Sequence, residues 1–333
     1  MTTPARPSRR GHAPTPLAQI RRRGYESLAP GCVVGVVAPA GPAAPERLAL
    51  VAPMIEVAGL RARIYPGCAL SSGYLAGDDD ARLADLHAAF ADDDVAAILC
   101  LRGGYGAMRL LDRIDLGLVR AHPKLVIGYS DITALHALLA YAGLPSLHAP
   151  MAASDLVQGG GESDRAALFA LLQRGLGAGA RLASPLDAAS ASAGLRAGGV
   201  AEGPLVGGNL SLVTALLGTR WAWRMNGAIL FLEEVGEEPY RIDRCLTQLR
   251  LAGALDAAAG FVLGSFTQAA SPAAVLREVL LAHCERSGKP LVGGWPAGHG
   301  TPNLPLPLGL RVRLDGDAGA VTLRQSLLRP AAS

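Results

Sequence analysis

Short apolar runs alternate with stretches of helical spacing over the first half of the chain. Three of these runs predict buried strands, because each is short, rich in Val, Ile or Leu, and ends at Gly, Pro or polar residues: CVVGVVAP at 32–39, VAAILCL at 95–101 and KLVIGYS at 124–130. Apolar residues at helical spacing predict helices over 45–59, 81–91 and 131–141. This alternation of strand and helix is typical of an open, parallel α/β sheet.

The composition changes at two points along the chain. The first thirty residues are rich in Pro, Arg and Ser and predict a disordered tail, so the first α/β domain is expected over 31–152. The Gly/Ala/Ser-rich stretch 153–203 predicts a connecting segment with little core. A second α/β domain is expected over 204–325, with strands in AILFLEEV and GFVLGSF and helices over 240–252 and 273–287.

Composition and charge exclude several classes of function. The formal charge is +3 and aromatic residues make up 5%, so neither a basic surface nor stacking platforms for nucleic acid are expected. The five cysteines are scattered and form no C-x-x-C pair, which argues against a disulfide framework and against a zinc site. The tail lacks an apolar core of the signal-peptide type, and no run approaches the roughly 18 to 20 apolar residues of a membrane span. We expect a soluble, cytoplasmic protein.

Ser130 ends an apolar strand and directly precedes a predicted helix. A serine on such a sharp turn can expose its hydroxyl near a helix N-terminus, although G-x-S-x-G is absent because Ile132 takes the last position. The simpler interpretation of this segment alone is a helix N-cap whose hydroxyl bonds the first turn. Ser130 is therefore a candidate nucleophile with a structural alternative.

His299 lies between two glycines in GWPAGHGTPNLPLPLG, a segment too rich in Gly and Pro for the interior of a helix or strand. A general base fits there, because the unperturbed pKa of histidine is near neutrality. An exposed loop histidine is the alternative. The other histidines lie in the tail, in predicted helices or beside strands, and have structural explanations: His12, His87, His122, His136, His148 and His283.

Two further segments come directly after predicted strands, where sites of parallel sheets form. Glu233 and Glu234 end AILFLEE, and pairing with a nearby arginine is their alternative. RGGYG at 102–106 brings glycines whose backbone N–H groups could form half of an oxyanion hole. A phosphate site or a simple turn is also open for this segment, although it does not match G-x-G-x-x-G.

In order, six segments make the chain similar to the LD-carboxypeptidase family of serine peptidases, which includes the microcin C self-immunity peptidases. They are GVVAPAGP at 35–42, LRGGYGAMRLL at 101–111, GYSDITALH at 128–136, GGNLSLVTALLGT at 207–219, LFLEEVGEEPYRIDR at 230–244 and GHGTPNLPLPLG at 298–309. The resemblance extends from Gly31 to about Leu323. It implies an N-terminal flavodoxin-like domain with an open parallel sheet and a smaller C-terminal α/β domain, with the active site at their interface.

The resemblance also implies the roles of particular residues. Ser130 would be the nucleophile, His299 the base, and Glu233 the carboxylate that orients the histidine, with Glu234 the less favoured occupant of that role. The backbone amides of Gly104 and Asp131 would form the oxyanion hole. For the free carboxylate of the substrate, Arg102 is the candidate, with a structural ion pair as the alternative.

The implied activity is hydrolysis of the LD-peptide bond to the terminal D-alanine of murein tetrapeptide, in cytoplasmic peptidoglycan recycling. The resemblance implies a homodimer and neither a cofactor nor a metal. The closest alternative is cleavage of peptidyl-nucleotide antibiotics, which in that branch uses aromatic residues after the nucleophile. Phe169 is the only aromatic residue within 151–203, which argues against this branch. Trp295 lies near His299 in the sequence and keeps the branch open.

Two alternatives come from other classes of protein. A non-catalytic binding protein on the same scaffold would need a broken triad, and none of the three residues is replaced. A glutaminase of the amidotransferase type would need a cysteine at the strand–helix turn, where this chain has Ser130.

Overall fold

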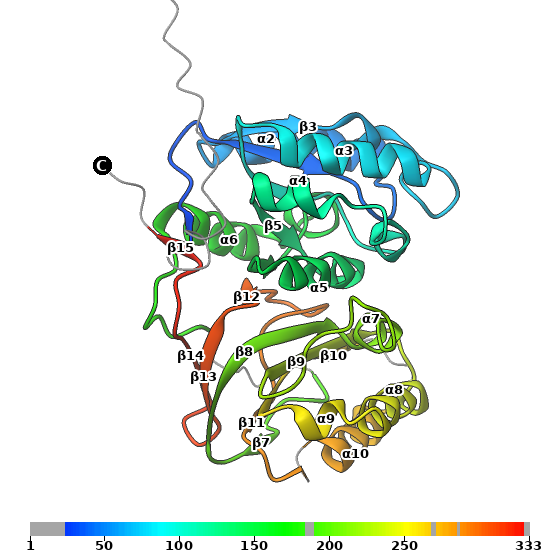
Figure 1. Cartoon of the computed structure of the whole chain (residues 1–333), viewed down its shortest axis with the longest axis vertical. Coiled ribbons are helices and arrows are strands. Elements are labelled where there is room, and N and C mark those ends of the chain that lie inside the picture. The colour runs from blue at the N-terminus through cyan, green and yellow to red at the C-terminus, as the bar shows by residue number, and fades with distance from the viewer. Residues whose placement is uncertain (1–23, 184–189, 268–270, 285–286, 330–333) are drawn as a thin grey trace, which may run out of the picture.

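The computed structural model describes residues 24–183, 190–267, 271–284 and 287–329. Two α/β bodies lie one above the other in Figure 1. The upper body contains most of the chain up to residue 174, and the lower body contains most of the later residues. The chain crosses between the two bodies more than once, so distant parts of the sequence meet at their interface.

The N-terminal sheet has six strands in the order β12-β6-β5-β4-β2-β3. They are β2 (Val33–Val37), β3 (Arg61–Ile64), β4 (Val95–Cys100), β5 (Leu125–Gly128), β6 (Ser146–His148) and β12 (Leu306–Leu308). The first five pair in parallel, in register from Val33 beside Arg61 to Gly128 beside His148. Numbered along the chain, their order is 2-1-3-4-5, which is the flavodoxin-like arrangement. The expected fold of this domain is confirmed.

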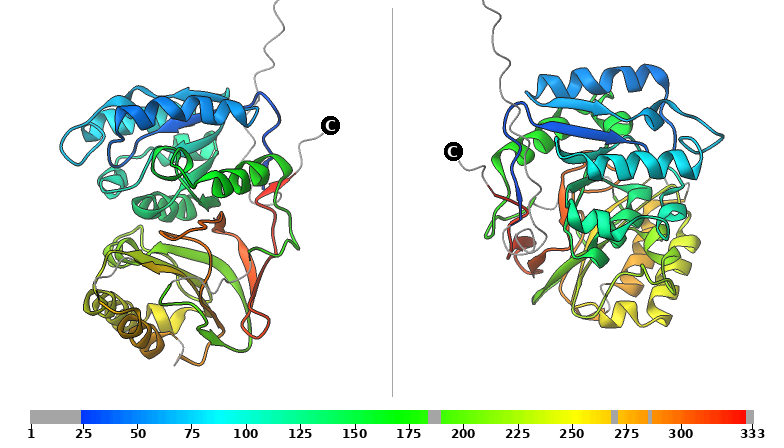
Figure 2. Two further views of the ribbon diagram at one scale, coloured as in Figure 1. Left: turned by 180° about the vertical axis from the view of Figure 1, so that it is seen from behind. Right: turned by 45° about the horizontal axis from the view of Figure 1, so that its top comes forward.

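Helices cover both faces of this sheet (Figure 2). On one face α3 (Asp79–Ala91), α4 (Leu116–Ala121) and α5 (Thr133–Ala142) pack side by side, and α2 (Pro45–Val57) and α6 (Glu162–Arg174) cover the other. Burial from both sides explains why β2, β4 and β5 read as continuous apolar runs rather than as alternating ones.

The C-terminal sheet has seven strands in the order β14-β13-β8-β9-β10-β11-β7. They are β7 (Arg196–Ala197), β8 (Val200–Asn209), β9 (Ile229–Val235), β10 (Gly260–Thr267), β11 (Leu291–Val292), β13 (Arg311–Asp315) and β14 (Ala320–Leu323). The four central strands, β8 to β11, are parallel, and antiparallel strands close both edges. Its helices are α7 (Leu210–Ala215), α8 (Pro239–Leu251), α9 (Ala254–Ala257) and α10 (Ala273–His283).

Two connections tie the bodies together. Strand β12 comes after the C-terminal sheet's β11 in the chain, yet it pairs antiparallel with β6 and so completes the N-terminal sheet. Strand β1 (Tyr25–Glu26) pairs in parallel with β15 (Leu328–Arg329), so both ends of the described chain meet. The domain division expected at residue 204 is therefore crossed by the chain.

The structure differs from the tail and the connecting segment that the sequence predicts. Within the tail predicted over 1–30, Tyr25 is buried and its hydroxyl donates to the carbonyl of Pro145 at 3.0 Å; residues 1–23 lie outside the described part. Within 153–203, α6 buries Leu168, Phe169 and Leu172 against the core, so this stretch is more than a connector. Residues 184–189 are also outside the described part.

Candidate active site

Ser130 lies where β5 passes into a 3-10 turn (Ser130–Ile132) and then into α5. Its backbone φ is 62°, and it is the one non-glycine residue with positive φ among the residues that the structure describes. Such strained backbone is held only by its surroundings and is a feature of strand–turn–helix nucleophiles. No side chain caps the start of the 3-10 turn, so the alternative N-cap role of Ser130 is not what the structure shows.

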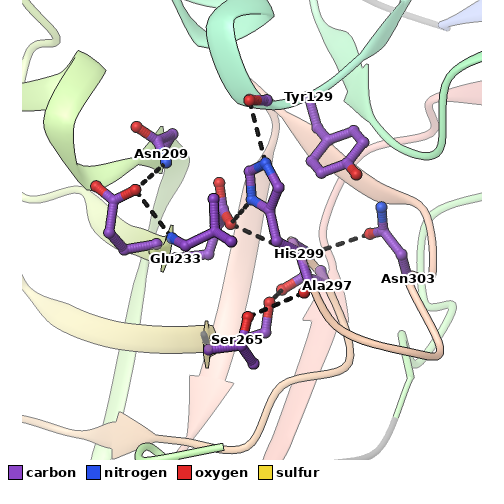
Figure 3. A network of polar contacts seen from close by, with 12 residues as sticks. Tyr129, Asn209, Glu233, Ser265, Ala297, His299 and Asn303 are labelled. Carbon is purple, nitrogen blue, oxygen red and sulfur yellow. Dashed lines mark hydrogen bonds and ion pairs between the residues drawn. The ribbon is translucent and has the colours of Figure 1, made fainter. Parts of the chain in front are cut away.

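His299 connects Ser130 to Glu233, and Figure 3 shows its bond to Glu233. Its Nδ1 lies 2.7 Å from Oε2 of Glu233, and its Nε2 lies 3.1 Å from Oγ of Ser130. Because a carboxylate only accepts hydrogen bonds, Nδ1 must carry the hydrogen in this contact. The neutral ring then has a free lone pair on Nε2, directed at the serine hydroxyl. This tautomer is the one in which histidine can take a proton from Ser130.

The loop that carries His299 is held by one bond within the loop and by bonds to two other parts of the structure. Oδ1 of Asn303 accepts from the N–H of Gly298 at 3.0 Å, and Oγ1 of Thr267 donates to the carbonyl of His299 at 3.0 Å. The N–H of Asn303 in turn donates to the carboxylate of Asp164 in α6, with both oxygens at 3.2 Å. The loop therefore has support from both bodies, since α6 belongs to the upper one.

Glycine is required at position 298 for a steric reason. Its φ is 111°, and a Cβ added there would lie 2.6 Å from Oε2 of Glu233. The backbone thereby comes close to the carboxylate, and the N–H of His299 also points at Oε2, at 3.3 Å. The glycine before the histidine lets chain and carboxylate approach to this distance.

Adjacent residues of β9 have separate partners. Glu233 is fully buried and faces His299, whereas Glu234 accepts from Asn209 Nδ2 at 2.7 Å and from the N–H and Oγ of Ser211 at 2.9 and 2.7 Å. The N–H of Asn209 donates across the interface to Oγ1 of Thr133, three residues after Ser130, at 3.0 Å. Glu234 therefore anchors the start of α7 against the helix that begins after the serine.

The charge of Glu233 also changes the protonation of His299. Burial alone would lower the pKa of His299, but the charge and the hydrogen bond of Glu233, helped by Glu234 and Asp155, outweigh it. The pKa of His299 is raised as a result. An imidazolium formed at this position is stabilised by the same carboxylate that orients the ring.

The loop after β4 lies directly against Ser130. A Cβ added to Gly103 would be 2.9 Å from Cβ and 3.1 Å from Oγ of Ser130, and 3.4 Å from the backbone nitrogen of Asp131. Gly104 is one residue further along, and its N–H has no hydrogen-bond partner within the described part of the chain. Gly103 thus contacts the serine and the backbone nitrogen of Asp131, whereas the nearest neighbours of Gly104 are Gly41 and Arg102, and its role in an oxyanion hole stays a prediction.

Arg102 borders the same loop. Its Nη1 donates to the carbonyl of Pro42 at 3.0 Å, and its Nε is buried without a partner in the described ranges. No carboxylate of the described residues forms an ion pair with it, so the alternative role of Arg102 as a structural ion pair is not seen. Its Nη2 lies 3.7 Å from the position that a Cβ of Gly104 would take, so the guanidinium is beside the glycine loop, where it can bind an anionic group.

Asp131 braces this loop with its side chain. Its Oδ2 accepts from the N–H of Ala107 at 2.8 Å, which joins the nucleophile turn to the end of the glycine loop. Burial raises the pKa of Asp131 to about 6, partly offset by that hydrogen bond and by Arg82. The carboxyl group is therefore near the boundary between charged and neutral at mildly acidic pH.

Sequence reasoning missed several groups that support the site. The ring of Tyr129 lies 4.8 Å from that of His299, centroid to centroid, and its hydroxyl donates to Oδ1 of Asp155 at 2.8 Å. Asn209 lies within GGNLS, and its position at the end of a strand is a signal that could have found it. Nothing local marks Tyr129 or Asp155, because their partners are distant in sequence.

Outside residues 1–23 and the other undescribed segments, no group of three or more His, Cys, Asp or Glu side chains is arranged to hold a metal ion. In the same part of the chain, no helix has the length and apolar character needed to cross a membrane.

The two-body fold and the Ser–His–Glu contact at its interface define a two-domain α/β enzyme of the hydrolase type. Residues 34–149 match the family model for the LD-carboxypeptidase N-terminal domain, and residues 202–314 match that for the C-terminal domain. The chain belongs to the LD-carboxypeptidase family, and is a peptidase by that membership.

Known relatives agree with this assignment. The chain is 38% identical over 300 residues to a probable murein peptide carboxypeptidase of Bacillus subtilis, covering 87% of this chain and 91% of the relative. It is 34% identical over 295 residues to the murein tetrapeptide carboxypeptidase of Pseudomonas aeruginosa, covering 85% and 93%.

Solved structures share the fold. The crystal structure of the muramoyltetrapeptide carboxypeptidase of Oxalobacter formigenes has a TM-score of 0.75 at 28% identity, covering 87% of this chain and 97% of that one. A microcin C7 self immunity protein has a TM-score of 0.79 at 23% identity, covering 92% and 99%, and this similarity speaks for the fold alone.

Proposed function

We propose that the protein is a serine carboxypeptidase that removes the terminal D-alanine of murein tetrapeptide. The observation that carries the proposal is the continuous contact from Glu233 through His299 to Ser130, at 2.7 and 3.1 Å. The murein peptide is supported by the relatives from Bacillus subtilis and Pseudomonas aeruginosa, whose names specify it.

In the proposed reaction, His299 Nε2 takes the hydroxyl proton of Ser130 as its Oγ attacks the carbonyl carbon of the scissile bond. Glu233 stabilises the imidazolium through Nδ1. The negative oxygen of the tetrahedral intermediate would be met by the amides of Gly104 and Asp131. His299 then gives its proton to the leaving amine, and D-alanine departs.

The acyl-enzyme is hydrolysed by the reverse set of proton transfers. Water attacks the ester carbon while Nε2 of His299 takes a proton from it, and that proton returns to Oγ of Ser130 as the ester breaks. Arg102 is proposed to pair with the free carboxylate of the substrate through its Nη2, which lies beside Gly104.

The peptidyl-nucleotide alternative finds less support. That activity needs aromatic faces open to a base, but Phe169 is 5% and Trp295 is 2% exposed. Both rings are packed in the core and neither can stack on a ligand without rearrangement. The murein peptide therefore remains the preferred substrate.

Incubation with murein tetrapeptide, followed by mass spectrometry of the products, tests the proposal. We expect tripeptide and free D-alanine, and no cleavage of an aspartyl-adenylate analogue offered at the same concentration. Cleavage of the analogue alone would replace the proposed substrate. Cytoplasmic recycling and a homodimer are implied by the family resemblance, and the dimer is open to a mass measurement in solution.

A further inference from the structure

A cavity lies away from the serine, at the opposite end of α5. Its volume is about 390 Å³, within the range of small-molecule sites. Its walls come from the C-terminal half of α5, the middle of β8 and the segment 220–224, so it opens between the two bodies where α5 faces the lower body in Figure 1. None of Ser130, Glu233 and His299 lines it. We call it the α5 pocket.

An unsatisfied donor belongs to this pocket. Trp223 lines it and is 7% exposed, and its indole N–H is buried without a hydrogen-bond partner among the residues that the structure describes. Leaving a buried donor unpaired costs on the order of 1–3 kcal/mol. The neighbouring Trp221 shows the usual arrangement, because its indole N–H donates to Oδ1 of Asp112 at 2.9 Å. Pairing the Trp223 donor with an acceptor in the pocket would recover that free energy and favours a small turn of the Trp223 ring toward the pocket.

The pocket is also positively charged. Arg220 and Arg224 line it, and no Asp or Glu does. Arg220 is partly compensated, since its Nε lies 3.2 Å from Asp112 and its guanidinium stacks on Trp221 at 4.3 Å from the ring centroid. Arg224 is exposed and has neither an ion pair nor a hydrogen bond within the described ranges. An anion at this position would meet a guanidinium with all its N–H groups available.

The remaining walls are apolar. Tyr141 and Leu144 contribute from the α5 side, and Val206 with Pro204 from β8. Tyr141 is 44% exposed and its ring lies against that of Trp221, 5.2 Å away at 76°. A ligand held here would place a flat apolar body between these side chains and its charged group toward Arg224.

We propose that the α5 pocket is a binding site for a small amphipathic anion, a carboxylate or sulfonate carried on an apolar ring. One acid oxygen pairs with Arg224, and another accepts from the indole N–H of Trp223 once this ring turns toward the pocket, because the N–H is buried in the structure. The apolar ring lies against Tyr141 and Leu144. This site is separate from the proposed peptidase site and does not depend on its substrate.

Fluorescence titration with 8-anilino-1-naphthalenesulfonate tests the proposal, because this probe has the stated chemistry and brightens in apolar surroundings. We expect saturable binding at one site per chain. Arg224→Gln should weaken it at least about tenfold, as loss of a charge-assisted hydrogen bond does. Trp223→Phe should weaken it several-fold, because it keeps an aromatic ring but removes the donor.

Two controls separate this site from others. Arg250→Gln removes an exposed arginine of α8 that does not line the pocket, and Ser130→Ala alters only the peptidase site, so both should bind the probe as wild type does. Thermal melting should show a smaller fall in melting temperature for Trp223→Phe than for Trp221→Phe, because only the Trp221 variant loses an existing indole hydrogen bond. Equal affinity in all variants, absence of saturable binding, or binding that disappears as the protein self-associates would overturn the proposal, whatever the outcome with murein peptide.

Discussion

Glu233 and His299 are 66 positions apart in the sequence and meet in a 2.7 Å hydrogen bond, where the loop after β11 reaches the end of β9. The bond leaves Nε2 of His299 free to face Ser130 at 3.1 Å. The next residue, Glu234, points to the other side of the strand and bonds Asn209. Two adjacent carboxylates thus serve different parts of the interface.

Amide replacements should separate these two carboxylates. We expect Glu233→Gln to lower kcat by about a thousandfold or more with little change in melting temperature, because it removes the charge that orients His299 and stabilises its charged form. Glu234→Gln should instead lower stability by roughly 1–3 kcal/mol, since its new NH₂ would face donors of Asn209 or Ser211. Its kcat should stay within about tenfold of wild type.

The two measurements are steady-state turnover and thermal melting of both variants. If Glu234→Gln loses turnover without losing stability while Glu233→Gln turns over normally, Glu234 is the carboxylate that serves the histidine. Normal turnover by both would place the third member elsewhere.

The pH dependence should report the raised pKa of His299. Only the neutral ring can take the proton of Ser130, so kcat/KM should fall on acidification with a midpoint above the ordinary 6.5. In Glu233→Gln the compensating charge is gone, and burial should move the pKa of His299 below that value. Titration of the ring protons by NMR measures both proteins; an unchanged pKa in the variant would contradict the account.

Asp131 should make stability depend on pH. Its pKa is raised from 3.8 to about 6 in the folded protein, so its contribution to stability is complete below about pH 4 and is lost as pH rises through about 6. Asp131→Asn keeps an acceptor for Ala107 without the buried charge. Urea unfolding should find it more stable than wild type by about 3 kcal/mol near pH 8 and equal near pH 4. Lower stability of the variant near pH 8 would show that the charge itself is needed.

Gly103 should tolerate no side chain. A Cβ there would lie 2.9 Å from Cβ of Ser130, and displacement of the serine by a fraction of this distance should lower kcat of Gly103→Ala by about a hundredfold. Gly159→Ala is the matched control, because a Cβ at Gly159 meets nothing within 4 Å. Similar turnover by both alanine variants would remove the close approach from the explanation.

The sequence predicted the parts of the fold that depend on local pattern. The runs at 95–101 and 124–130 became β4 and β5, because strands buried on both faces need continuous apolar residues. The helix expected over 81–91 is α3, which begins two residues earlier at Asp79 behind the cap Asp78. These features are set by residues that are neighbours in the chain.

The parts that depend on distant pairing were not predicted. Strand β12 contains Pro307 in a proline-rich segment, which a sheet tolerates at an edge, and nothing local shows that it joins β6. The pairing of β1 with β15 and the burial of Phe169 in α6 were missed for the same reason. At the site, spacing alone could not bring Glu233 to His299 or show that Glu234 bonds Asn209.

The central claim is that the hydroxyl of Ser130 attacks the peptide. Its most direct test is turnover of murein tetrapeptide by Ser130→Ala and by wild type, with mass spectrometry of released D-alanine at equal concentrations of folded protein. The account predicts that the variant releases D-alanine at least about a thousandfold more slowly. Its melting temperature should match that of wild type, because the substitution removes only the hydrogen bond between the hydroxyl and His299. Release within about tenfold of the wild-type rate would show that Ser130 is not the nucleophile.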